Sequence, residues 1–261
     1  MVEQLLARLQ SAATSRATFA EPAAQARKAV RLARGPAAHK LIAFPAPLAL
    51  CGPQQYARLA QTFRGVRDTL VLTIPGFVGT ERVPATLSVA IDDQAQAIMR
   101  AADGATPILA GYSTGGTLAY GMAAHLASIG VPVGAVVLLD AYPTGEQTPV
   151  TEQLAAVILR LFRNPQWSGY LNDTRLSAMG WYTRLVMEWK LTAVSAPTLL
   201  VRPTSPMPGV AGDGAWQAVW PFKHDCLDVP GDHYTMMEEH ADSTAAAVEQ
   251  WLNALPAAQH P

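Results

Sequence analysis

The chain has 261 residues, half of them apolar and 15% charged, which is enough to bury the core of one large α/β domain or two small ones. Its formal net charge is −1, which argues against a dedicated binder of nucleic acid or of a membrane surface. The sequence contains no run of about eighteen uncharged apolar residues, so we expect no transmembrane helix. Its first residues do not resemble a signal peptide.

The first 36 residues differ in pattern from the rest of the chain. Leu5, Leu6 and Leu9 form a short helical stripe, and a second helix is predicted over 23–34, before the helix stop Gly35-Pro36. Residues 1–40 also hold seven Lys or Arg and only two Glu. We expect a helical appendage, either a docking or dimerisation arm or a frayed and partly solvated end.

From Lys40 onward, short apolar runs alternate with helical patterns. The runs are continuous, as in strands that are buried on both faces, and they cover 40–44, 69–74, 107–111, 135–140, 198–202 and 226–229. The helical patterns cover 53–63, 86–102, 117–129 and 241–254. This alternation predicts an α/β fold with a mostly parallel sheet that helices cover on both sides.

One connection is much longer than the others, with 57 residues between the strand ending at Asp140 and the strand starting at Thr198. Apolar residues recur there with helical spacing: Leu154, Val157, Ile158, Leu161 and Phe162. A second helix is predicted within 174–191. The connection therefore reads as an inserted helical subdomain, of the kind that caps an active site.

The pentapeptide Gly111-Tyr112-Ser113-Thr114-Gly115 fits G-x-S-x-G, the nucleophile elbow, between a predicted strand and a predicted helix. Such a turn holds the serine in a strained conformation, and the glycines let strand and helix approach closely. The helix N-terminus offers free N–H groups, so we expect the N–H of Thr114 to bind a developing oxyanion. The alternative is a glycine-rich turn that only caps a helix.

A nucleophilic serine needs a base that takes its proton. In this fold the base follows the last strand, where His233 lies in VPGDHYTMMEEH. His240 is the competitor, expected near the start of the last helix. The other histidines precede a strand, lie within a helix or belong to the tail: His39, His125, His224 and His260.

The acid that orients this histidine has two candidates. Asp140 ends the strand after the helix of Ser113, at the sheet edge where the site is expected. A carboxylate there is costly unless a partner such as the histidine N–H pairs with it. Asp213 follows the penultimate strand at a greater distance. We favour Asp140, with a loop carboxylate bonded only to backbone as the alternative.

With these residues assigned, the chain resembles the terminal thioesterases of modular polyketide synthases, most closely the macrolide-forming members. The matching stretches lie between residues 40 and 252: CGPQQYARLA, GYSTGG, VVLLDAYPTG, DTRLSAMGWYTRL, APTLLVR, WPFKHD and VPGDHYTMMEEHAD. The resemblance implies an α/β-hydrolase domain over 37–261, with a helical lid at about 144–196 between strands 6 and 7. It also implies that residues 1–36 form a helical dimerisation element, and it agrees with Asp140 as the acid.

The family's activity is the release of a full-length polyketide through an acyl-serine, by macrolactonisation or by hydrolysis. The resemblance thus implies an acyl carrier domain as partner, a polyketide acyl chain on its phosphopantetheine arm, a homodimer, and no bound cofactor or metal. It makes Tyr112, Tyr142, Trp181 and Tyr182 candidate contacts of the substrate, with the core of the lid as the alternative for the lid aromatics.

Two departures from the family concern the oxyanion hole. Thr114 stands where the family often has alanine, which keeps the N–H. The second donor comes from the loop FPAPLAL, where Pro45 and Pro47 have no N–H. The donor is then Ala46 or Leu48, and we favour Leu48.

Two other classes of function remain open on the sequence. One is a stand-alone editing thioesterase or a hydrolase of small esters, and the other is a non-enzymatic relative that binds a ligand or partner. Cys51 and Cys226 have no metal or redox spacing, so we expect two reduced thiols in a cytoplasmic protein.

Overall fold

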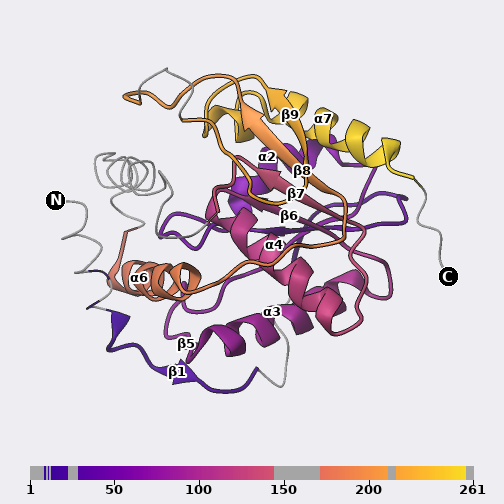
Figure 1. The fold of residues 1–261 in the computed structure, drawn as a ribbon. Helices are drawn as coiled ribbons and strands as arrows, with labels where there is room; N and C mark the ends of the chain where they lie inside the picture. The colour runs from indigo at the N-terminus through magenta and orange to yellow at the C-terminus, as the bar shows by residue number, and fades with distance from the viewer. Residues whose placement is uncertain are drawn as a thin grey trace.

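A seven-stranded sheet forms the middle layer of the protein (Figure 1). The computed structural model describes residues 9, 11, 13–22, 29–143, 171–210 and 216–256. The strand order is β2-β4-β3-β6-β7-β8-β9, and only β2 pairs antiparallel with its neighbour. Their bounds are β2 Val30–Ala33, β3 Leu41–Phe44, β4 Thr69–Val71, β6 Ile108–Tyr112, β7 Ala135–Leu139, β8 Thr198–Pro203 and β9 Asp225–Val229. The predicted α/β fold with a mostly parallel sheet is confirmed.

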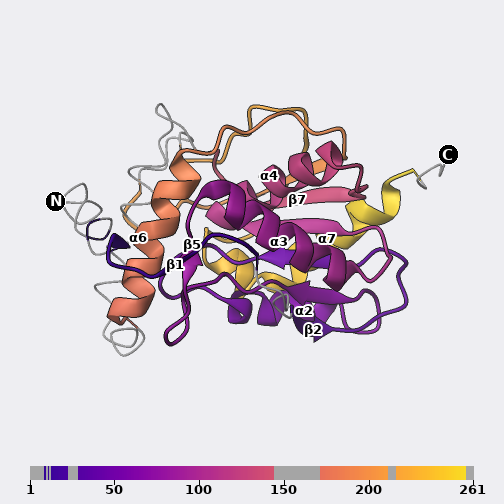
Figure 2. The ribbon, with the colours of Figure 1, turned by 90° about the horizontal axis from the view of Figure 1, so that it is seen from below.

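Helices cover both faces of this sheet (Figures 1 and 2). On one face lie η1 (Pro53–Tyr56), α2 (Ala57–Thr62) and α7 (Ala241–Ala254), and on the other lie α3 (Leu87–Ala102) and α4 (Thr114–Ser128). Neighbouring residues of one strand point to opposite faces: Ile108 and Ala110 pack with α2 and α7, whereas Leu109 packs with α3 and α4. This double burial explains why the inner strands β3, β6 and β7 are continuous apolar runs.

The helix predicted over 23–34 is wrong at its C-terminal end. Val30–Ala33 form β2, which pairs with β4 at the edge of the sheet. The backbone groups of β4 need partners on that side, and this long-range pairing overrides the local helical pattern. Residues 23–28 lie outside the described part. The boundary predicted at residue 36 therefore does not separate an appendage from the sheet, and dimerisation through residues 1–36 stays a prediction.

The long insertion between β7 and β8 contains α6 (Asp173–Met187), which confirms the second helix predicted there. The Asn172 side chain caps α6 by accepting a hydrogen bond from the N–H of Arg175 (3.0 Å). Leu9 and Ala13 from the N-terminal segment pack with α6 in one apolar cluster. The helix predicted around Leu154 to Phe162 lies outside the described residues.

Arg16 joins the N-terminal segment to α6. Its guanidinium donates to the Thr174 carbonyl (2.7 Å) and the Ser177 hydroxyl (2.9 Å) on α6, and to the carbonyls of Gly76 (2.8 Å) and Glu81 (2.7 Å). Just after it, β1 (Thr18–Phe19) pairs with β5 (Val83–Pro84), beside α6 in both views (Figures 1 and 2). Within the described helices, none is long and apolar enough to cross a membrane.

The turn from β6 into α4 depends on the two glycines of the G-x-S-x-G pattern. A Cβ at Gly111 would overlap the backbone of Gly115, and a Cβ at Gly115 would overlap the carbonyl oxygen of Phe44 on β3. Strand and helix can therefore approach this closely only because both residues lack a side chain. The predicted role of the glycines is confirmed.

We expect Gly115→Ala to lower the free energy of unfolding by about 1–3 kcal/mol, because backbone must move to make room for the methyl group. Gly134→Ala is the matched control, since its Cβ would meet nothing closer than Thr106 Cγ2 at 3.5 Å. We expect it to change stability by no more than about 0.5 kcal/mol. Urea denaturation measures both, and equal effects would contradict the packing argument.

A buried ion pair ties α7 to the loop before β4. Arg67, 4% exposed, donates through Nε and Nη2 to both carboxylate oxygens of Glu249 (2.9 and 2.8 Å) and through Nη1 to the carbonyl of His39 (2.7 Å). Removing one partner leaves an uncompensated buried charge. The exposed pair of Arg202 and Asp228 has similar bidentate geometry without the burial.

Arg67→Ala should therefore destabilise the protein by about 3–5 kcal/mol, and Arg202→Ala by less than about 1 kcal/mol. The measurement is the urea midpoint at unchanged slope. A loss for Arg67→Ala as small as that for Arg202→Ala would show that Glu249 is not held in a buried pair.

Candidate active site

Ser113 occupies the strained turn between β6 and α4. Its backbone has φ 56° and ψ −131°. Of the described non-glycine residues, only Asp103, Ser113 and Asp140 have positive φ, so two of the three belong to this site. The N–H of Ser113 donates to the carbonyl of Leu139 (2.9 Å), which extends the pairing of β6 and β7 by one residue. The elbow predicted from the sequence is confirmed as a conformation.

Asp140 lies beside Ser113 because their strands are neighbours in register. Tyr112 pairs with Leu139 in the parallel ladder, so the next residue of each strand leaves the sheet at the same edge. The N–H of Asp140 donates to the carbonyl of Val201 on β8 (2.8 Å). Its side chain points to His233 and is almost fully buried, at 1% exposure.

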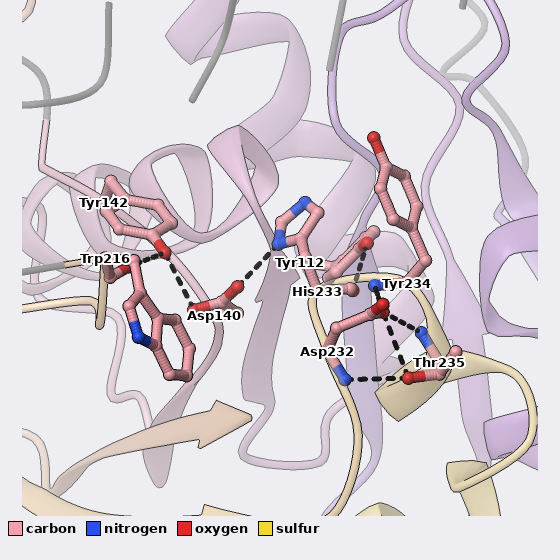
Figure 3. Close-up of polar contacts among 8 residues, drawn as sticks. All are labelled: Tyr112, Asp140, Tyr142, Trp216, Asp232, His233, Tyr234 and Thr235. Carbon is pink, nitrogen blue, oxygen red and sulfur yellow. Dashed lines mark hydrogen bonds and ion pairs between the residues drawn. The ribbon is translucent and has the colours of Figure 1, made fainter. Parts of the chain in front are cut away.

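His233 and Asp140 form a short buried hydrogen bond (Figure 3). His233 Nδ1 lies 2.6 Å from Asp140 Oδ2, and the histidine is only 5% exposed. The carboxylate accepts, so Nδ1 carries the proton and donates it. The other ring nitrogen points away from Asp140 (Figure 3). In a neutral ring that nitrogen has a free lone pair and can accept a proton.

Tyr142 holds the second oxygen of the same carboxylate. Its hydroxyl lies 3.2 Å from Asp140 Oδ1 and 2.9 Å from the carbonyl of Trp216 (Figure 3). The single proton of this hydroxyl is shared between the two acceptors, so the second oxygen of Asp140 has a weaker hydrogen-bonding neighbour than the first. This role of Tyr142 is not visible in the sequence, because the short spacing from Asp140 does not reveal the direction of the hydroxyl.

A tight loop after β9 carries His233. Gly231 has φ 96°, which favours glycine, and Asp232 Oδ1 accepts from the N–H groups of Tyr234 and Thr235, both at 2.9 Å. The Thr235 hydroxyl in turn accepts from the Asp232 N–H (2.7 Å), and η3 (Thr235–Met237) follows. This local network, visible in Figure 3, sets the direction of the histidine. Asp232 is a positioning residue that was not predicted from the sequence, although Gly followed by Asp is typical of turns.

Tyr112 supports His233 from the side of the nucleophile. Its ring stacks on the imidazole at 4.8 Å between centroids, and its hydroxyl donates to the His233 carbonyl (2.6 Å). Burial, and then the charge of Asp140, raise the pKa of Tyr112 well above its usual value, so the phenol stays a donor. Its own N–H donates to the hydroxyl of Tyr56 (2.8 Å), which donates to the Phe44 carbonyl (2.6 Å).

Ser113 and His233 line one cavity of about 560 Å³. Tyr112 lines it too, so it can contact a bound substrate as well as the histidine. Apolar side chains such as Leu48 and Met237 form part of the wall. The polar part includes Gln55, Arg58 and Arg175. The cavity is large enough for a sizeable organic ligand beside the serine.

The structure corrects the expectation for Leu48 as an oxyanion donor. Its N–H already donates to the carbonyl of Ala46 (2.8 Å). The Ala46 N–H, in contrast, makes no backbone hydrogen bond within the described part of the chain. It lies close to the start of α4, because a Cβ added to Gly115 would come within 3.2 Å of the Ala46 nitrogen. Thr114 is the first residue of α4, where helical N–H groups have no partner within the helix. Ala46 and Thr114 therefore each offer an N–H without a backbone partner among the described residues, close to the turn of Ser113.

The structure also corrects the expected place of three aromatic residues. Among the described residues, none of these three, Tyr142, Trp181 and Tyr182, lines the cavity of Ser113 and His233. The Trp181 indole donates to the Pro84 carbonyl (2.8 Å), and the Tyr182 ring stacks on Phe77 at 5.9 Å. Both belong to the apolar cluster under α6, which is the alternative that the sequence left open.

The other titratable candidates lie elsewhere or outside the described residues. His240 directly precedes α7, as expected. His39 and His224 contact nearby backbone carbonyls, and His125 lies within α4. Asp213 and His260 are outside the described residues.

Comparison with known proteins gives a consistent family. The model of the family described as "Thioesterase domain" matches residues 39–252. The chain is 40% identical to polyketide synthase GfsE of Streptomyces halstedii over 263 residues, which cover 97% of this chain. It is 36% identical to erythronolide synthase EryA3 of Saccharopolyspora erythraea over 223 residues, which cover 85% of this chain. It spans only 7% of the length of each of these relatives.

Solved structures agree on the fold. The thioesterase domain of NocB from the nocardicin cluster has a TM-score of 0.66 at 19% identity, covering 87% of this chain and 99% of that one. The SrfTE thioesterase domain, described in the cyclization of surfactin, has a TM-score of 0.58 at 18% identity, covering 84% and 92%. Because the family model covers most of the sequence and the two polyketide synthases are more than 30% identical, this chain belongs to the thioesterase domain family.

Proposed function

We propose that this domain releases a polyketide from an acyl carrier domain through an acyl-Ser113 intermediate, with His233 as base and Asp140 as the acid that orients it. The observation that carries the proposal is the buried hydrogen bond of 2.6 Å between His233 and Asp140, because His233 also lines one cavity with Ser113. The similarity to polyketide synthases supports the class of substrate.

In the first step, Ser113 Oγ attacks the carbonyl carbon of the thioester while the free ring nitrogen of His233 takes the hydroxyl proton. The N–H groups of Thr114 and Ala46 stabilise the oxyanion, and donors of this kind contribute roughly 3–4 kcal/mol each. The carbon–sulfur bond then breaks, and the departing phosphopantetheine thiol receives the proton from His233. Asp140 stabilises the imidazolium that exists between these proton transfers.

In the second step, a nucleophile attacks the acyl-serine and His233 accepts its proton. A hydroxyl of the same acyl chain gives a macrolactone, and water gives the free acid. The proton returns to Ser113 Oγ as the ester bond breaks. Exclusion of water from the cavity and the path of the acyl chain decide between the two products.

The polyketide reaches Ser113 on a carrier domain, and the domain itself uses no cofactor in these steps. Delivery by a carrier domain is supported by the relatives, in which the matching segment is a small part of a much longer chain. Macrolactonisation and hydrolysis can be distinguished by incubating the domain with a long hydroxyacyl thioester of a phosphopantetheine analogue and measuring the mass of the product. The free acid is heavier than the macrolactone by one water.

Ser113→Ala should abolish covalent labelling by a fluorophosphonate and acyl transfer from the thioester, because it removes the proposed nucleophile from the strained turn. The covalent complex of the NocB thioesterase domain with a fluorophosphonate analogue makes this probe suitable. Intact-protein mass spectrometry is the measurement. Ser128→Ala, at the far end of α4, is the control and should label like the wild type. Full labelling of Ser113→Ala would overturn the assignment.

Asp140→Ala should slow acyl-enzyme formation and release by about 10⁴-fold, as expected when the histidine loses its orienting acid. Asp213→Ala tests the other candidate from the sequence and should have little effect. Single-turnover acylation, followed by mass spectrometry, measures both variants. The reverse ranking would transfer the role of the acid to Asp213.

A further inference from the structure

The lining of the cavity combines apolar residues with polar and charged ones. Arg175 from the first turn of α6 and Gln55 from η1 both line the cavity of Ser113. Cys51 lines the same cavity, and the charge of Arg175 and the side chain of Gln55 both lower the pKa of its thiol. Burial nevertheless raises the pKa of Cys51 to about 12, so the thiol is neutral and does not pair with the arginine.

Arg175 has donors to spare in this lining. Its Nη1 donates to the carbonyl of Ala49 (2.7 Å), and its other guanidinium N–H groups make no hydrogen bond within the described residues. The turn of α6 that carries it is fixed by the Asn172 cap and by Arg16, which binds Thr174 next in the chain. Arg175 is therefore a preorganised donor at the cavity.

Gln55 supplies the complementary group. Its amide oxygen is buried and has no hydrogen-bond partner within the described residues. A buried acceptor without a partner costs free energy, which a donor on a bound ligand would recover. The terminal torsion of glutamine is broad, so a ligand in the cavity can turn the amide toward itself.

We propose that Arg175 and Gln55 form a subsite that binds a hydroxyl group of the acyl chain. A hydroxyl both accepts and donates, so it can accept from the Arg175 guanidinium and donate to the Gln55 oxygen at once. A ketone or carboxylate satisfies Arg175 but has no proton for Gln55, and an alkyl chain satisfies neither. This inference rests on the proposed acyl transfer to Ser113, and it adds a preference for where the chain is hydroxylated.

The test uses N-acetylcysteamine thioesters of one chain length: the unsubstituted chain and a series with a single hydroxyl at successive carbons. The readout is kcat/KM for loading of Ser113, expressed as the ratio of hydroxylated to unsubstituted chain. We expect one position to be favoured at least tenfold, which corresponds to about 1.4 kcal/mol. Arg175→Leu and Gln55→Leu should each bring this ratio close to one.

Arg184→Leu is the matched control, since Arg184 lies on the same helix over the ring of Trp181 (4.2 Å) and outside the cavity lining. Its ratio should stay at the wild-type value. Gln55→Leu leaves the hydrogen bond between Arg175 and the Ala49 carbonyl in place. A loss of the preference in this variant therefore cannot come from a displacement of α6. Loading without any positional preference, or a preference that survives both variants, would overturn the subsite alone. Failure of every thioester to load Ser113 would overturn the proposed function and the subsite with it.

Discussion

The buried carboxylate of Asp140 is the constraint on which the site is built. A charge with almost no contact to water is unfavourable unless hydrogen bonds replace its hydration. His233 supplies one bond at 2.6 Å and Tyr142 supplies another at 3.2 Å, from a loop after β9 and from the segment after β7. The network of Asp232 and Thr235 fixes the loop of His233 before any substrate arrives. The same arrangement leaves the other nitrogen of the imidazole available for proton transfer.

The sheet also holds two residues in strained conformations. Ser113 and Asp140 both have positive φ, at a cost of about 1–3 kcal/mol each. Their N–H groups donate to the carbonyls of Leu139 and Val201, so the sheet stabilises both turns by extending its own hydrogen bonds. The contact of Gly115 with β3 brings the loop of Ala46 next to the first turn of α4. Strain and close packing thus place the hydroxyl and the free N–H groups of the elbow together.

The cavity wall depends on parts of the chain that lie far in sequence from Ser113, Asp140 and His233. Arg16 precedes the first strand of the main sheet, yet it binds α6 and the loop of Gly76 to Glu81. The helix α6 carries Arg175 to the cavity and packs Trp181 and Tyr182 away from it. The N-terminal segment therefore contributes to the shape of the site as well as to the edge of the sheet.

The sequence by itself determined the fold class and all the predicted strands of the main sheet from residue 40 onward. It also placed Ser113 and Asp140 at strand ends and His233 on the loop after the last strand. These features follow from local patterns, because burial on both faces produces continuous apolar runs and the elbow requires glycine at fixed spacing. Tertiary structure decided the features that depend on long-range partners. Val30–Ala33 became a strand because β4 needed a neighbour, and the N–H of Leu48 was lost to the Ala46 carbonyl in a turn. Tyr142 turned its hydroxyl to Asp140, since a buried charge attracts a donor that no spacing in the sequence reveals.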